Sequence, residues 1–205
     1  LKQWQAQAGS AISATGAIYC IRREYYQTPP ADATDDFMIS TGVIAANRRL
    51  QFAPDAVAWE APAEGGRREL ARKVRVITRG LRSVYYRRQL LNPFKTGIYG
   101  LELLVHKVWR RMVWLPLVLL VALTPALLSG SAFAFAIGLG VSCFVILGLA
   151  GAVPWIARAF KPAEIATYIW LVNFACAKAT YNFLAGRRIS HWHLPRSDTP
   201  GGRPS

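Results

Sequence analysis

Three carboxylates lie close together near the start of the sequence, in the segment TPPADATDDF. Asp32, Asp35 and Asp36 follow an Arg-Arg pair and a Pro-Pro turn, in a chain with 11 acidic residues against 25 Lys and Arg. A carboxylate in such a position can act as a general base and take a proton from an attacking hydroxyl. Asp is also favoured in the first turn of a helix, where it caps free N–H groups and meets the positive end of the helix dipole. The residue types leave both uses open and, taken alone, favour the cap.

The distribution of charge indicates a membrane protein. The formal net charge is +14, and residues 67–111 hold thirteen Lys or Arg against two Glu. The 44 residues from Met112 to Trp155 then contain no charged side chain. A bilayer core needs about 20 apolar residues per helix, so this run is long enough for two spans. Because the cationic segment adjoins this run, it should face lipid, which argues against nucleic-acid binding.

Residues 1–66 have the pattern of an α/β unit. Residues 17–21 (AIYCI) and residues 50–59 have the apolar alternation of strands. Between them, a helix-like apolar pattern begins behind Thr34 and Asp35 as candidate caps. The order strand, loop, helix, strand is typical of a layered α/β domain.

The remainder of the chain is predicted to be helical. Residues 67–111 predict basic and amphipathic interfacial helices. Residues 112–186 predict a transmembrane region with spans at about 112–129, 132–154 and 165–186. The cations before the first span place residues 1–111 in the cytoplasm by the positive-inside rule. The Pro- and Gly-rich residues 187–205 predict a disordered tail.

Five segments in this order resemble a known family. They are SATGAIYCIRRE, TDDF, FAPDAVAWEAP, ELARKVRVITRG and HKVWRRMVWLPL, followed by the spans. Together they resemble the C-terminal half of the membrane-embedded family 2 glycosyltransferases, the cellulose-synthase-like and hyaluronan-synthase-like enzymes of bacterial type. The resemblance covers nearly the whole chain. It implies an α/β fold, as part of a GT-A-like catalytic domain, followed by α-helical transmembrane segments.

The resemblance implies roles for the acidic and small residues. Residues 34–36 are similar to the family's Thr-Glu-Asp motif, whose last acid is the catalytic base. This similarity gives Asp36 the role of base and Asp35 a supporting role. The family's acceptor-side segment of small residues matches Thr15, Gly16 and Ala17.

The resemblance also implies a diphosphate-binding role for Arg72 and Arg75. They fall where many members have Gln-x-x-Arg-Trp. Here Arg72 replaces the Gln and Val76 replaces the Trp, so long processive synthesis is not implied. Guanidinium groups suit phosphate because they donate forked hydrogen bonds to it.

The implied activity is inverting transfer from a nucleotide-sugar donor to a saccharide or lipid-linked acceptor, as in polysaccharide biosynthesis. We expect it at the cytoplasmic face of the inner membrane, in a multi-pass protein with membrane lipids as partners and no nucleic acid. The family's Mg- or Mn-binding aspartates belong to an N-terminal catalytic half that precedes this stretch. No metal ligand is therefore assigned in this chain, and the isolated chain should be inactive. The alternative is a non-catalytic assembly or export subunit that docks anionic lipid.

Overall fold

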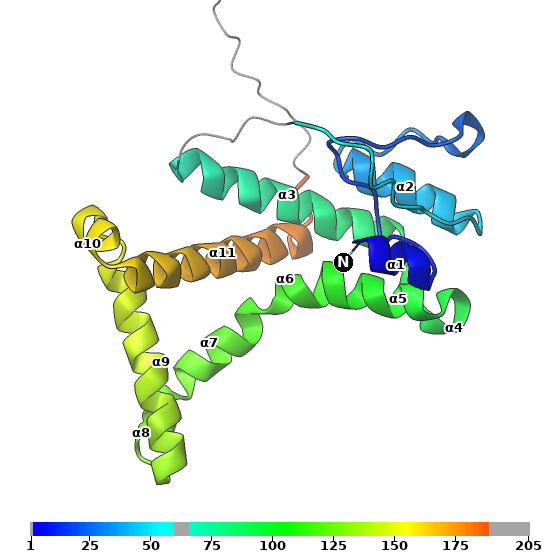
Figure 1. Ribbon diagram of the computed structural model, residues 1–205. Helices are drawn as coiled ribbons and strands as arrows, with labels where there is room; N and C mark the ends of the chain where they lie inside the picture. The colour runs from blue at the N-terminus through cyan, green and yellow to red at the C-terminus, as the bar shows by residue number, and fades with distance from the viewer. Residues whose placement is uncertain (1, 60–65, 189–205) are drawn as a thin grey trace, which may run out of the picture.

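The computed structural model describes residues 2–59 and 66–188, which form helices joined by turns and extended segments (Figure 1). The α-helices are α1 (Lys2–Ala8), α2 (Asp35–Ala45), α3 (Gly66–Tyr86), α4 (Pro93–Thr96), α5 (Ile98–Leu103), α6 (Arg110–Met112), α7 (Trp114–Ala122), α8 (Thr124–Leu128), α9 (Ala132–Ala150), α10 (Pro154–Ala159) and α11 (Lys161–Leu184). Two 3-10 turns, η1 (Arg23–Tyr25) and η2 (Arg88–Leu91), and one π-helical segment, η3 (Leu104–Trp109), complete the set.

The predicted fold class, α/β with a partial GT-A-like domain, is wrong for the described residues. They are mostly helical and form no sheet, and their bridge pairing is an isolated one between Thr15 and Ile18. Residues 17–21 and 50–59 were expected to be strands, but they run as extended or turn segments with no strand partner beside them. Alternation favours a strand only when a neighbour supplies the ladder hydrogen bonds.

Two helices that the sequence predicts, one after Thr34 and one in the basic segment, are present in the structure. The predicted helix behind Thr34 and Asp35 is confirmed as α2; Thr34 occupies the N-cap position, but its hydroxyl makes no capping hydrogen bond and lies 3.0 Å from the Ser83 hydroxyl. The predicted basic helix is confirmed as α3. Phe37 and Met38 of α2 pack with Val84 of α3 in a buried cluster that also holds Leu90 and Leu103.

The apolar stripe of α3 is buried against protein. Its N-terminal half places Val74 against Ala175 and Ala179 of α11. Its C-terminal half places Val84 in the cluster with α2. Figure 1 shows α3 lying along α11, with α2 beside the C-terminal end of α3. One helix therefore joins the site to the C-terminal helix.

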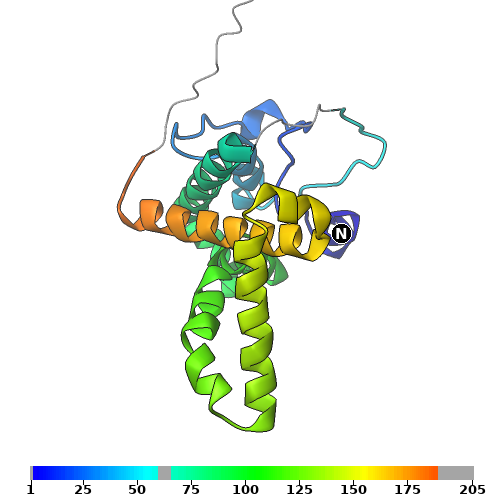
Figure 2. The same cartoon turned by 90° about the vertical axis from the view of Figure 1, so that its left-hand side faces the viewer.

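A helical hairpin extends away from the other elements (Figure 2). Its first leg consists of α7 and α8, and its second leg is α9. The first leg breaks between Ala122 and Thr124, before Pro125, which has no N–H to continue the helix. The Thr124 hydroxyl donates to the Leu120 carbonyl oxygen at 3.2 Å and satisfies one carbonyl at the break.

Among the described residues, α9 is the helix that is long and apolar enough to cross a membrane. It lies within the second predicted span, 132–154. The first predicted span, 112–129, is divided between α7 and α8, and α11 occupies the third, 165–186. These two segments remain predictions as spans. The predicted tail lies outside the described residues beyond Arg188.

Small residues bring α9 and α11 into close contact. A Cβ at Gly148 would collide with the Trp170 ring, and one at Gly151 would collide with the Ala163 carbonyl. The Thr167 hydroxyl donates to the Gly148 carbonyl oxygen at 2.8 Å. Close backbone approach through glycine is a common way to pack helices in membranes.

The Gly148 contact yields a stability prediction. We expect Gly148→Ala to lower the free energy of unfolding by about 1–3 kcal/mol, because the new methyl group overpacks the interface with Trp170. Gly140→Ala is the control, since a Cβ at Gly140 in the same helix meets nothing within 4 Å. Thermal unfolding in detergent micelles measures both variants. Equal midpoints for the two variants would contradict the close packing.

Candidate active site

The candidate site lies where α2 begins. Asp36 is half-buried in the first turn of α2, and Asp35 before it is exposed. The buried Ser40 hydroxyl, one turn later, donates to the Asp36 carbonyl oxygen at 2.6 Å. The same hydroxyl accepts from the backbone N–H of Ala14 at 3.1 Å. Ser40 therefore holds the segment that contains Thr15, Gly16 and Ala17 against the start of α2.

The Asp36 carboxylate faces this segment. A Cβ at Gly16 would lie 3.8 Å from Asp36 Oδ2, in ordinary contact. Gly16 and Ala17 occupy the tip of a tight turn closed by the bridge between Thr15 and Ile18. The structure thus brings the predicted acceptor-side residues to the predicted base, although they are separated by about twenty positions in the sequence.

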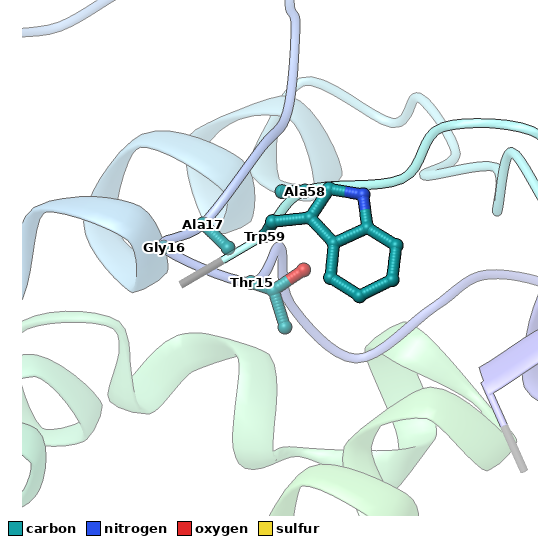
Figure 3. Close-up of a pocket in the computed structure, with 5 residues that line it drawn as sticks. All are labelled: Thr15, Gly16, Ala17, Ala58 and Trp59. Carbon is teal, nitrogen blue, oxygen red and sulfur yellow. The ribbon is translucent and has the colours of Figure 1, made fainter. Parts of the chain in front are cut away.

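An open cavity of about 550 Å³ adjoins this contact. It is lined by Thr15, Gly16, Ala17, Ala58 and Trp59. Figure 3 shows the Trp59 indole above the turn that carries Thr15, Gly16 and Ala17, with α2 behind. The indole is 95% exposed. A flat aromatic surface beside a carboxylate can bind a ligand that has an apolar face and a polar edge.

Tyr19 lies close enough to the carboxylates to sense their charge. Burial raises the pKa of the Tyr19 phenol, and the negative charges of Asp36 and then Asp35 raise it further. The phenol, which lines the second cavity described below, thus stays protonated over a wider pH range than a free tyrosine.

The turn before α2 is fastened to α3 at four consecutive residues, Asp32, Ala33, Thr34 and Asp35, which we call the anchor turn. Asp32 accepts from Arg82 at 2.9 Å and from the Tyr86 hydroxyl at 3.1 Å. Arg79 donates to the Ala33 carbonyl oxygen and lies 3.4 Å from Asp35 Oδ1. The Ser83 hydroxyl accepts from the Thr34 backbone N–H at 2.8 Å. Side chains from α3 thus fix the backbone that leads into Asp36.

Within the anchor turn, the Asp32–Arg82 ion pair is buried. Both side chains are 9% exposed. Burial alone opposes ionisation of Asp32, but the hydrogen bonds from Arg82 and Tyr86 outweigh it, so the pKa of Asp32 lies below its ordinary value. The Asp35–Arg79 pair is different, because Asp35 is 66% exposed and such pairs contribute little.

The predicted diphosphate-binding residues lie on α3 before the anchor. Arg75 is half-buried one turn before Arg79, and Arg72 is exposed. The guanidinium that reaches Asp35 belongs to Arg79. The structure therefore places Arg72 and Arg75 on the helix that leads to the site, and Arg79 and Arg82 at the site itself.

A second, larger cavity of about 880 Å³ shares Thr15 with the first. Its walls come from residues 11–25, from Ser40 and Val43 of α2, and from residues 48–56, including Arg22, Arg48 and Arg49. Arg48 Nε donates to the Tyr25 hydroxyl at 3.1 Å. This cavity is open, and none of its lining residues belongs to α3.

Sequence reasoning did not assign Trp59, Tyr19 or the anchoring side chains of α3 to the site. The signal for the last group was present, because Arg79, Arg82, Ser83 and Tyr86 recur at helical spacing and share one face. Trp59 gave no such signal, since it lies on an extended segment about 40 residues after the turn with which it lines the cavity.

A divalent metal does not fit the described residues. They contain no group of three or more His, Cys, Asp or Glu side chains that could hold an ion. The metal that the resemblance implies has no ligand set in this part of the chain.

Comparison with known proteins gives no match: no family model, no curated protein and no solved structure is similar to this chain.

The buried ion pair yields a pH-dependent prediction. Asp32→Asn should lower the free energy of unfolding at pH 7 by about 3 kcal/mol, because it leaves the Arg82 charge buried without its partner. The folded-state pKa of Asp32 is depressed, so its stabilisation is present above the unfolded-state value near 4 and is lost as the pH falls through the lower folded value.

Chemical denaturation followed by tryptophan fluorescence, at several pH values, measures this effect. The gap between parent and Asp32→Asn should therefore shrink below about pH 4. Asp55→Asn is the control, since it makes the same chemical change in an exposed turn. A gap that stays constant down to pH 2 would contradict the role of the Asp32 charge.

Proposed function

We propose that this chain supplies the acceptor side of an inverting, nucleotide-sugar-dependent glycosyltransferase at a membrane face. One observation carries the proposal: Gly16 lines a cavity together with Thr15, Ala17 and Trp59, and a Cβ placed at Gly16 would lie 3.8 Å from the half-buried Asp36 carboxylate. A carboxylate at the edge of a ligand-sized cavity is the arrangement that base-assisted attack by a hydroxyl requires.

Trp59, Thr15 and Asp36 would each play a different part in the reaction. Trp59 offers a flat face for the apolar side of a sugar ring, and the Thr15 hydroxyl offers a polar contact. Asp36 takes the proton of the acceptor hydroxyl as its oxygen forms the new glycosidic bond and the nucleoside diphosphate leaves. Holding the acceptor beside the base supplies much of the rate by proximity.

The donor side requires residues beyond this chain. Arg72 and Arg75 provide cations on α3 for the departing diphosphate. The sugar-nucleotide pocket belongs to an N-terminal catalytic half that must assemble with this chain. The proposal places that half and residues 1–111 on the cytoplasmic side of a multi-pass inner-membrane protein, with α9 as one of its spans.

The alternative, a non-catalytic subunit that docks anionic lipid, depends on cations of α3 that face outward. Arg79 and Arg82 of α3 instead bond to the anchor turn, and Arg87, which directly follows α3, bonds to Met38 of α2. Burial also lowers the pKa of the Arg87 guanidinium, which lies against Gly42 of α2. These three side chains support a role in building the site over a role in lipid contact.

The base assignment yields the main functional prediction. Asp36→Asn in the complete gene product should reduce sugar transfer by at least about 1000-fold, because the amide cannot accept the acceptor proton. Labelled nucleotide sugars incubated with membranes that hold the protein measure transfer. Glu164→Gln, an exposed change on α11, is the control for insertion and expression. Normal turnover by Asp36→Asn would refute the assignment.

The diphosphate assignment yields a second functional prediction. Arg75→Ala should raise the donor KM more than Arg88→Ala does, because it removes a phosphate-facing cation. Arg88 is a suitable comparison, since it is exposed and lies over the Tyr85 ring beyond the end of α3. The same assay with varied donor concentration measures both. Equal changes in the two variants would assign the effect to the overall charge of the basic helix.

A further inference from the structure

We infer that the C-terminal end of α11 sets the position of the Asp36 carboxylate, with Arg82 as the positioning residue that bridges the two. The inference rests on the proposed function for the role of Asp36 as base. A series of contacts connects the end of α11, through α3, to the first turn of α2.

The end of α11 has a defined geometry. Gly186 has a φ of +67°, a left-handed conformation that glycine adopts without strain. The Arg187 N–H donates to the Asn182 carbonyl oxygen at 3.0 Å, and the Gly186 N–H donates to that of Phe183 at 3.1 Å. This pair of bonds is the Schellman motif, and it turns the chain sharply after the helix. The turn places the Arg187 carbonyl where α3 can reach it.

Arg82 joins this carbonyl to the anchor turn. Its NH2 nitrogen donates to the Arg187 carbonyl oxygen at 3.2 Å, and its NH1 nitrogen donates to Asp32 Oδ2 at 2.9 Å. The residue is 8% exposed, so both bonds form largely out of water. Because a guanidinium is planar and rigid, moving the acceptor at one end disturbs the bond at the other. Arg188 Nε also lies 3.7 Å from Asp32, but its side chain is 77% exposed and it contributes little.

The anchor turn carries this constraint to the carboxylate. Three residues separate Asp32 from Asp36, and two of them, Thr34 and Asp35, are held by Ser83 and Arg79. The Met38 N–H donates to the Thr34 carbonyl oxygen at 3.0 Å, which begins the bonding of α2. Asp36 therefore has little freedom to move unless the anchor turn moves with it.

The far end of α11 packs on α9, the helix that can cross a membrane. A shift of α11 against α9 would reach Asp36 through Arg82. The base is thus positioned by an element that also contacts the candidate span, without any direct contact between the span and the site.

The first variant perturbs the α11 turn and leaves every site residue in place. Gly186→Val should strain the left-handed turn and displace the Arg187 carbonyl. Gly97→Val is the matched control, because Gly97 also has a positive φ, +61°, and a Cβ at either glycine meets nothing within 4 Å. Arg82→Lys is the second variant, since its single ammonium keeps a charge for Asp32 but lacks the fork that spans both acceptors.

Hydrogen exchange of the full chain in detergent, read by mass spectrometry, is the structural measurement. Gly186→Val and Arg82→Lys should speed exchange in residues 33–41 by about tenfold, the factor given by a loss of about 1.4 kcal/mol. Gly97→Val should leave these residues unchanged. Unchanged exchange in both test variants, or equal acceleration by Gly97→Val, would overturn the inference.

Sugar transfer by the complete gene product provides the second measurement. Both test variants should lower kcat by about tenfold and leave the donor KM unchanged, because they displace the base and not the diphosphate-binding cations. A rise in donor KM at constant kcat would overturn the positioning role. If the parent protein transfers no sugar, the proposed function fails, while the exchange measurement still decides whether α11 positions Asp36.

Discussion

The buried ion pair between Asp32 and Arg82 is the interaction on which the arrangement of the site depends. It is formed by a residue in a turn and a residue in a helix fifty positions later, and burial makes it intolerant of losing either partner. Around it, Tyr86, Ser83 and Arg79 fasten the rest of the anchor turn. These contacts restrain the backbone at the start of α2, and they therefore restrain the position of Asp36 in its first turn.

Helix α3 contacts the rest of the protein through two different faces. One face is apolar and packs Val74 on α11 and Val84 on α2. The other is cationic, and its Arg79 and Arg82 side chains bond inward to the anchor turn. A helix with so many Arg residues has the sequence pattern of a lipid-facing helix. In the structure, however, the side chains of Arg79 and Arg82 bond to other parts of the protein. The combination makes α3 the support on which the site and the C-terminal helix are both mounted.

The features that the sequence predicted are those encoded locally. A cap position before an apolar pattern predicted α2, a repeating stripe predicted α3, and uninterrupted apolar composition predicted the segment that contains α9. The strands failed because alternation at residues 17–21 and 50–59 describes a preference that only a partner strand can fulfil. The pairing of Asp32 with Arg82, and the cavity that Trp59 and Gly16 both line, connect residues distant in sequence. No single-sequence pattern reports such pairings.

The break at Pro125 gives the two legs of the hairpin unequal stiffness. Helix α9 has no proline to interrupt its backbone hydrogen bonds, and with 19 residues it is about 28 Å long, close to the thickness of the hydrocarbon core. The opposite leg has given up such a bond at its proline, and a threonine hydroxyl compensates one of the freed carbonyls. If both legs cross a bilayer, a mismatch with a thinner or thicker membrane would be taken up by bending at the kink of the first leg, while α9 would keep its length.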